Sequence, residues 1–258
     1  MTGCAPSAPP SPQSPSAGSP TATSTSATPE ASASTAVPSR TAPPAVPGSL
    51  AGRIVTTIPT SAKVVALTFD AGASAAGVRS ILATLTESGV PATFFPTGAF
   101  ARSFPDQVRA MAAAGHRVGN HSDSHPDFTT LTAAGQVAQL TRAEDEIRSL
   151  SGRTTRPWFR FPYGASTPAT ITTANAQGYA CMGWTVDTLG WQGTSGGRSV
   201  ESVVGRVTSA LRPGLIALMH VGAHPQDSST LDADALPRII SELRARGYDF
   251  VTLDAAAG

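Results

Sequence analysis

The chain has 258 residues, a formal net charge of +1 and only 14% charged residues. It shows neither a basic stripe nor aromatic residues interleaved with basic ones, so nothing in it favours nucleic acid as a partner. It also lacks a run of eighteen apolar residues, and we therefore predict no membrane-spanning helix.

The first fifty residues differ in composition from the rest. They hold eleven of the 22 prolines and two charged residues, Glu30 and Arg40. Such a Pro-, Ser-, Thr- and Ala-rich segment buries too little apolar surface to offset the entropy of ordering it. We predict a disordered N-terminal tail over residues 1–50, serving as a tether, and one domain over residues 51–258.

Two cysteines are present, Cys4 in the tether and Cys181 in an apolar run. Cys181 is expected to be a small buried apolar residue, not a disulfide partner of Cys4. Cys4 follows Thr2 and Gly3, which resembles the junction where bacterial lipoproteins are cleaved and acylated, but no apolar signal segment precedes it. Two interpretations stay open: a chance cysteine in a biased segment, or a lipid anchor with translation starting upstream.

Short apolar runs alternate with helix-period segments along the domain. We predict seven strands, at residues 64–69, 92–96, 117–119, 158–161, 179–184, 215–220 and 250–253. Between them, apolar residues at helical spacing predict helices around residues 78–85, 108–111, 137–150, 200–211 and 236–243. This alternation is typical of a parallel α/β fold. The length falls short of the ~250 residues of an eight-unit barrel, so we expect an incomplete or distorted barrel. An open doubly wound sheet is the alternative, although no glycine-rich phosphate loop is present.

The first strand ends in the sequence VVALTFDAG, residues 64–72. In barrels of this kind the chemistry collects at the C-terminal ends of the strands. Asp70 stands at that end, and Gly72 allows the chain to turn directly after it. We predict that the Asp70 carboxylate points into the mouth of the barrel.

The segment NHSDSHPDF, residues 120–128, follows the third strand. His121 and His125 are four residues apart, and on a helical turn this spacing places two imidazoles on one face. Two such imidazoles can chelate one divalent metal ion. The alternative is a surface turn with incidental histidines.

Three further polar groups stand at predicted strand ends. Arg160 lies in FRFPYG, where its charge needs a partner and Pro162 leaves the Tyr163 N–H free to face a ligand. Asp187 lies in WTVDTLGW, whose last residue, Trp191, could form the wall of a sugar site. His220 ends the buried run GLIALMH.

Together these motifs resemble the NodB-type polysaccharide deacetylases, the family 4 carbohydrate esterases. The resemblance runs from Val64 to about Leu253 and includes the ending RGYDFVTL. It implies a distorted (β/α)7 barrel and a hydrolase that removes acetyl groups from N-acetylated, or O-acetylated, sugars with a divalent metal ion, zinc being expected. The substrate would be peptidoglycan, a chitin-like polymer or xylan, and the protein a monomer outside the cell or on its surface.

The resemblance also implies a role for each matching residue. Asp70 would be the general base and Arg160 would hold it in place. His121 and His125 would be metal ligands. The Tyr163 backbone N–H would stabilise the oxyanion, and His220 would be the general acid, with Asp187 as a further acidic residue of the site.

Two positions depart from the family pattern. Ala71 stands where the family has a metal-binding Asp, and Gly190 stands where it has an Asp that tunes the catalytic His. Asp123 and Asp187 are conceivable replacements. An active enzyme is the favoured interpretation, because the other site residues are all present. The alternatives are a carbohydrate-binding relative without turnover and a hydrolase of a non-sugar C–N bond.

Overall fold

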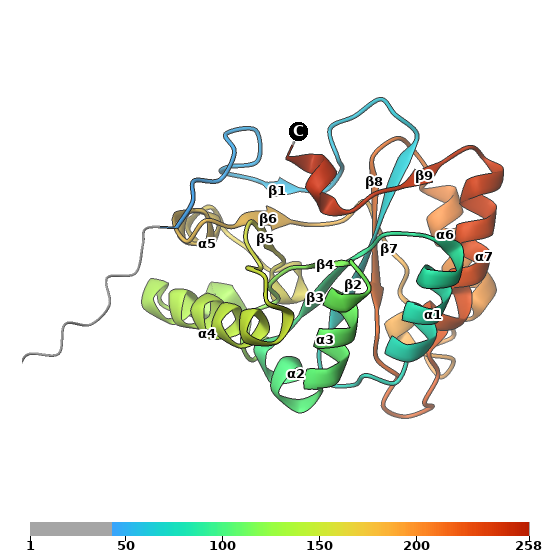
Figure 1. Ribbon diagram of the computed structural model, residues 1–258, viewed down its shortest axis with the longest axis horizontal. Coiled ribbons are helices and arrows are strands. Elements are labelled where there is room, and N and C mark those ends of the chain that lie inside the picture. The colour runs from blue at the N-terminus through green and yellow to red at the C-terminus, as the bar shows by residue number, and fades with distance from the viewer. Residues whose placement is uncertain (1–42, 258) are drawn as a thin grey trace, which may run out of the picture. The chain divides into compact units, whose positions relative to one another are not determined.

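A computed structural model of the protein describes residues 43–257, which form one compact unit (Figure 1). Most of the predicted tether, with Cys4, lies outside these residues. Its last part does not: Leu50 is fully buried in an apolar cluster and Val46 packs against the same cluster. The folded domain therefore begins before residue 51, where the composition had placed the boundary.

The strands form two sheets whose named pairs are all parallel. One sheet has the order β1-β6-β5, and the other has the order β4-β3-β2-β8-β7, with β9 also paired to β2. The bounds are β1 Ile54–Val55, β2 Val64–Ala71, β3 Thr93–Pro96, β4 Arg117–Val118, β5 Trp158–Phe159, β6 Ala180–Met182, β7 Val186–Asp187, β8 Leu215–His220 and β9 Asp249–Phe250.

Single contacts bring the two sheets toward a closed ring. A parallel bridge joins Asn120, just after β4, to Phe159 of β5. On the other side the Thr185 N–H donates to the Ile216 carbonyl, so the segment between β6 and β7 is tied to β8. The result is the predicted distorted α/β barrel, whose strands run in one direction and end at one face.

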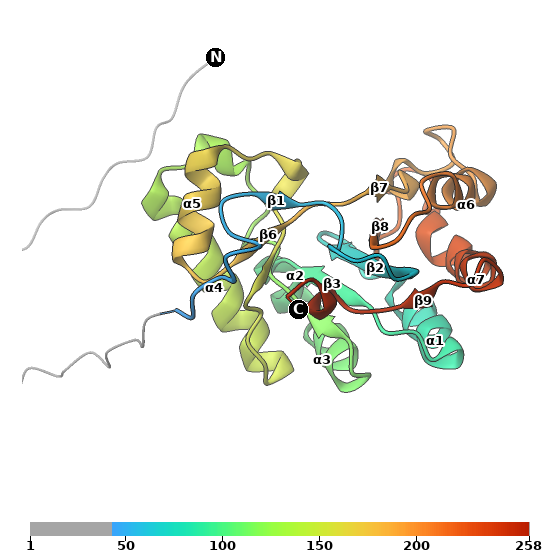
Figure 2. The same cartoon turned by 90° about the horizontal axis from the view of Figure 1, so that it is seen from above.

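Seven α-helices in the described residues cover the strands. They are α1 Val78–Ser88, α2 Gly98–Ser103, α3 Pro105–Ala113, α4 Ala133–Ser151, α5 Pro168–Ala176, α6 Val200–Ser209 and α7 Leu231–Ala245. Figure 2 shows α1, α6 and α7 grouped on one side of the strands and α4 and α5 on the opposite side. No helix in the described part of the chain is both long and apolar enough to cross a membrane.

Helix ends follow local chemistry that the sequence already contained. Gly89 closes α1 in the left-handed conformation, with φ of 61°, and its N–H returns to the Leu85 and Thr86 carbonyls. Thr132 caps α4 by accepting the Gly135 N–H at 3.2 Å. Cys181 is fully buried, as predicted, and burial raises its pKa to about 12.

Candidate active site

A pocket of about 520 Å³ lies at the C-terminal ends of the strands. Its walls come from β2, β8 and the loops that follow β4, β5 and β7. The lining includes Asp70, His121, His125, Tyr163, Asp187, Trp191 and His220. Six of the seven predicted site residues therefore line the pocket themselves, and the seventh, Arg160, lies buried behind Asp70.

Asp70 and Arg160 form a buried ion pair at the base of the site. Arg160 Nη1 lies 2.8 Å from Asp70 Oδ1, and the Arg160 side chain is fully buried. Its other donors reach Thr68 Oγ1 at 2.9 Å and the Gly183 and Met182 carbonyls. Burial alone would raise the pKa of Asp70, but the Arg160 charge, helped by His121 and His220, holds it below its ordinary value. Asp70 is therefore an ionised carboxylate with a fixed orientation.

His121 is held by its ring Nδ1, which lies 2.9 Å from the Arg160 carbonyl. A carbonyl only accepts, so Nδ1 carries the proton and Nε2 faces the pocket, 3.3 Å from Asp70 Oδ2. The His125 ring lies edge-on to it, with centroids 4.8 Å apart. Burial lowers the pKa of both imidazoles, that of His125 to about 4, so both rings are neutral at pH 7.

The histidine segment is not the helical turn that the four-residue spacing suggested. Ser122 and His125 have left-handed φ values of 70° and 61°. Asn120 Oδ1 accepts the Ser122 N–H, and Ser122 Oγ accepts the His125 N–H. These side-chain bonds replace helical backbone bonds, so a loop brings the two rings together.

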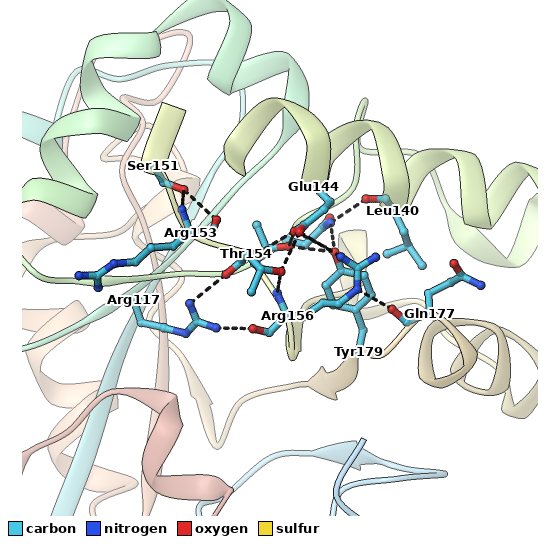
Figure 3. A network of polar contacts seen from close by, with 11 residues as sticks. Arg117, Leu140, Glu144, Ser151, Arg153, Thr154, Arg156, Gln177 and Tyr179 are labelled. Carbon is cyan, nitrogen blue, oxygen red and sulfur yellow. Dashed lines mark hydrogen bonds and ion pairs between the residues drawn. The ribbon is translucent and has the colours of Figure 1, made fainter. Parts of the chain in front are cut away.

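A polar network around Glu144 and Tyr179 (Figure 3) is connected to this loop through Asn120. The Asn120 amide donates to the Leu140 carbonyl at 2.9 Å and to the Tyr179 hydroxyl at 3.0 Å. Tyr179 in turn contacts Thr155 and the Glu144 carboxylate. The network connects the loop to α4, and so fixes the position of Asn120 beside His121.

Asp123 does not replace the acidic ligand missing at position 71. Its Oδ1 accepts a 2.7 Å hydrogen bond from Arg102 Nη1 and packs beside Gly98 on α2. Ala71 is fully buried in the apolar cluster and does not line the pocket.

The donor set fits a divalent ion only in part. His121 offers a ring whose second nitrogen is anchored to a carbonyl, the usual arrangement of a metal-bound imidazole, and His125 lies beside it. However, within residues 43–257 no group of three or more His, Cys, Asp or Glu side chains is placed to hold a metal ion. These residues supply two imidazoles without a third protein ligand.

Two aromatic side chains stand at the rim. Tyr163 has a left-handed φ of 59°, is 72% exposed and lies edge-on to His125. Trp191 is 49% exposed, and its ring centroid lies 6.4 Å from that of His220. The Asp187 carboxylate accepts the Leu189 N–H at 2.8 Å and faces the Trp191 indole N–H at 3.4 Å.

His220 ends β8 and is the register partner of Asp70 on β2. Burial would lower its pKa, but the nearby Asp232 carboxylate and the charges of Asp70 and Asp187 raise it. Asp232 was not among the residues singled out from the sequence. It lies on α7 in an otherwise apolar helix face, and only the fold brings it to His220.

Comparisons with known proteins identify the family. Residues 57–182 match the family model described as polysaccharide deacetylase. The chitooligosaccharide deacetylase of Sinorhizobium fredii is 34% identical over 203 residues, covering 76% of this chain and 93% of that protein.

Solved structures show the same fold. The Bc1960 peptidoglycan N-acetylglucosamine deacetylase has a TM-score of 0.71 and 32% identity, over 78% of this chain and 91% of the other. Wild-type BA3943 from Bacillus anthracis, described as a CE4 family pseudoenzyme, has a TM-score of 0.73 and 25% identity, over 81% of this chain and 70% of the other.

Proposed function

Because the chain belongs to the polysaccharide deacetylase family, hydrolases that act on the amide bonds of N-acetylated sugars, we propose that it removes acetyl groups from a cell-wall or extracellular polysaccharide with a divalent metal ion. The observation that carries this proposal is the convergence of Asp70, held by Arg160, with His121 and His220 around one pocket.

Asp70 is the proposed general base. Its carboxylate is ionised and oriented by Arg160, so it can take a proton from an attacking water. An amide carbonyl is a poor electrophile, and its oxygen gains negative charge during attack. The Tyr163 backbone N–H, in the turn that lines the pocket, is the proposed donor to that oxygen.

His220 is the proposed general acid. Its raised pKa keeps the ring protonated nearer to neutral pH, so it can give a proton to the leaving amine. Asp70 and His220 stand on adjacent strands as register partners, so the base and the acid flank one reacting group. Asp187 adds negative charge near His220.

His121 and His125 are the proposed metal ligands, and zinc is the proposed ion because neutral imidazole suits it. A divalent ion bound there supplies Lewis acidity toward the acetyl carbonyl. With two protein ligands instead of three, we expect binding weaker than in a complete site.

The test is acetate release from acetylated chitooligosaccharides, peptidoglycan and acetylated xylan, with and without added zinc. Release from at least one sugar polymer, lost in Asp70→Asn, is the expected result. Acetate release only from non-sugar amides would instead indicate a hydrolase of a non-sugar C–N bond. An inactive wild-type chain that still binds the polymer would favour a carbohydrate-binding relative without turnover, an alternative motivated by Ala71 and by the likeness to the BA3943 pseudoenzyme.

We also propose that the protein acts as a monomer at the cell surface, tethered by its N-terminal segment and acylated at Cys4. The Pro-, Ser- and Thr-rich composition of the residues that precede the folded domain suits a spacer between a membrane and an insoluble polymer. Fatty-acid labelling of the natural protein, compared with Cys4→Ser, tests the anchor, and light scattering tests the monomer. Equal labelling of both proteins would reject acylation at Cys4.

A further inference from the structure

Asp232 is a buried carboxylate that has no role in the proposed reaction so far. It lies in the first turn of α7, and its side chain is 3% exposed. Oδ2 accepts the backbone N–H of His220 at 2.8 Å, and Oδ1 accepts the Thr188 hydroxyl at 2.6 Å. The carboxylate is thus fixed between the loop after β7 and the end of β8.

The Oδ2 atom of Asp232 also faces the ring of His220. Nδ1 of His220 lies 3.7 Å from Asp232 Oδ2, within ion-pair range but longer than a hydrogen bond. This Nδ1 is buried and has no hydrogen-bond partner in the described structure. A catalytic hydrogen bond is often long before substrate binds, and Asp232 is the carboxylate to which Nδ1–H can turn.

Gly190 leaves the space that this carboxylate fills. A Cβ added at Gly190 would lie 2.4 Å from Asp232 Oδ1 and 2.9 Å from Oδ2. A side chain at position 190 and the carboxylate of residue 232 therefore compete for one place. An acid reaching it from either position would face His220.

We propose that Asp232 is the positioning residue of the general acid, a carboxylate that orients the His220 ring with Nδ1–H toward α7 and Nε2 toward the pocket. This inference rests on the proposed function, in which His220 gives a proton to the leaving amine. Asp232 itself touches no substrate; it acts through His220, as an acid that holds a catalytic imidazole in one tautomer.

The effect of Asp232 on His220 must be distinguished from that of other groups near the ring. Asp70 on β2 and Asp187 on β7 raise the pKa of His220 together with Asp232, and His121 and His125 line the same pocket. A carboxylate in the first turn of a helix is favourable in itself, because it meets the positive end of the helix dipole. Asp234 shares that turn but is exposed, so it offers a matched control.

The first test compares Asp232→Asn with Asp234→Asn. Asparagine has nearly the same shape: its amide oxygen can still accept the His220 backbone N–H, and its NH2 can donate to the Thr188 hydroxyl oxygen, so folding should be retained. We expect Asp232→Asn to lower kcat about 100-fold with KM nearly unchanged, and the alkaline limb of activity to move to lower pH. The pKa of His220, measured by an NMR titration, should fall by about one unit. Asp234→Asn should change none of these.

The second test moves the carboxylate. Gly190→Asp alone should lose activity because the two acids compete for one place. Gly190→Asp combined with Asp232→Ala should have a kcat at least about tenfold higher than that of Asp232→Ala alone. The inference would be overturned if Asp232→Asn kept the wild-type His220 pKa and the wild-type kcat. It would also be overturned if the double variant folded but had no higher kcat than Asp232→Ala. The His220 titration needs no substrate, so it decides the inference even if the proposed deacetylation fails.

Discussion

Arg160 Nη1 donates a 2.8 Å hydrogen bond to Oδ1 of Asp70, a residue 90 positions earlier in the chain. Both groups are buried, and the guanidinium also lies 4.4 Å from the centre of the Phe95 ring. The other hydrogen bonds of the guanidinium go to Thr68 and to the Met182 and Gly183 carbonyls. The ion pair therefore fixes where the carboxylate points.

Replacing Asp70 by Asn should abolish its use as a base while keeping most of its contacts. An amide oxygen can still accept from Arg160, but it cannot take a proton from water at neutral pH. We expect kcat to fall at least about 100-fold. The measurement is acetate release, with the exposed Asp106→Asn as control. Activity of Asp70→Asn within a few-fold of wild type would reject the assigned role.

Metal binding should depend on both imidazoles of the loop. We expect about one zinc ion per wild-type chain after dialysis against buffered zinc, and almost none in His121→Ala or His125→Ala, because one imidazole alone holds zinc weakly. His224→Ala is the control, since His224 lies at the pocket rim paired with Asp227 at 3.2 Å. Elemental analysis gives the metal content. Unchanged zinc in His121→Ala would contradict the ligand assignment.

Most of the barrel could be predicted because buried parallel strands are apolar along their length. β2 and β8 are plain in the sequence for this reason, and the polar residues that end them identify the active face. Helix α5 escaped prediction, since its sequence PATITTANA has no apolar stripe at helical spacing. The two-residue strand β1 was also missed.

The candidate site was predicted where its residues stand at strand ends, and missed where tertiary contacts decide. Asp232 lies one residue into α7, and nothing local distinguishes it from the exposed Asp234 two positions on. Its burial depends on Gly190 and Thr188, more than 40 residues earlier. The left-handed backbone of His125 was likewise hidden, because the four-residue spacing is compatible with a helical turn.

The pH dependence of the wild-type enzyme should report His220. Asp232, Asp70 and Asp187 raise its pKa above the ordinary value of 6.5, although burial opposes them. A raised pKa keeps the proton donor charged to higher pH, and the donor is lost as pH rises through that value. We therefore expect the alkaline midpoint of kcat/KM above pH 6.5. A midpoint below that value would contradict the assignment of His220 as the acid.

Trp191 should contribute to sugar binding and little to chemistry. Its half-exposed ring forms part of the pocket wall beside His220, where a sugar face can pack on it. We expect Trp191→Ala to raise KM about tenfold with kcat within about twofold. Trp191→Phe keeps an aromatic face and should recover most of the affinity. A fall in kcat without a change in KM would instead assign Trp191 to the positioning of His220.

The Glu144 carboxylate should stabilise the protein at neutral pH and lose this effect at acidic pH. Its carboxylate accepts the Thr155 N–H at 2.8 Å and the Thr154 hydroxyl at 2.7 Å, and it pairs with Arg156 at 3.0 Å. Burial opposes ionisation, but these partners hold its pKa below the ordinary 4.5. A lowered pKa means that the stabilisation is present above 4.5 and is lost as pH falls through the native pKa.

Glu144→Gln should therefore lower the free energy of unfolding by about 1–3 kcal/mol at pH 7, because the amide removes the carboxylate partner of Arg156 and offers one accepting oxygen instead of two. Urea unfolding at neutral pH and again at acidic pH measures it, and the gap from wild type should narrow as pH falls. Glu146→Gln, two positions along α4, should stay within about 0.5 kcal/mol. If Glu144→Gln lost the same free energy of unfolding at every pH, Glu144 would act by packing. Its charge, paired with Arg156, would then add nothing to stability.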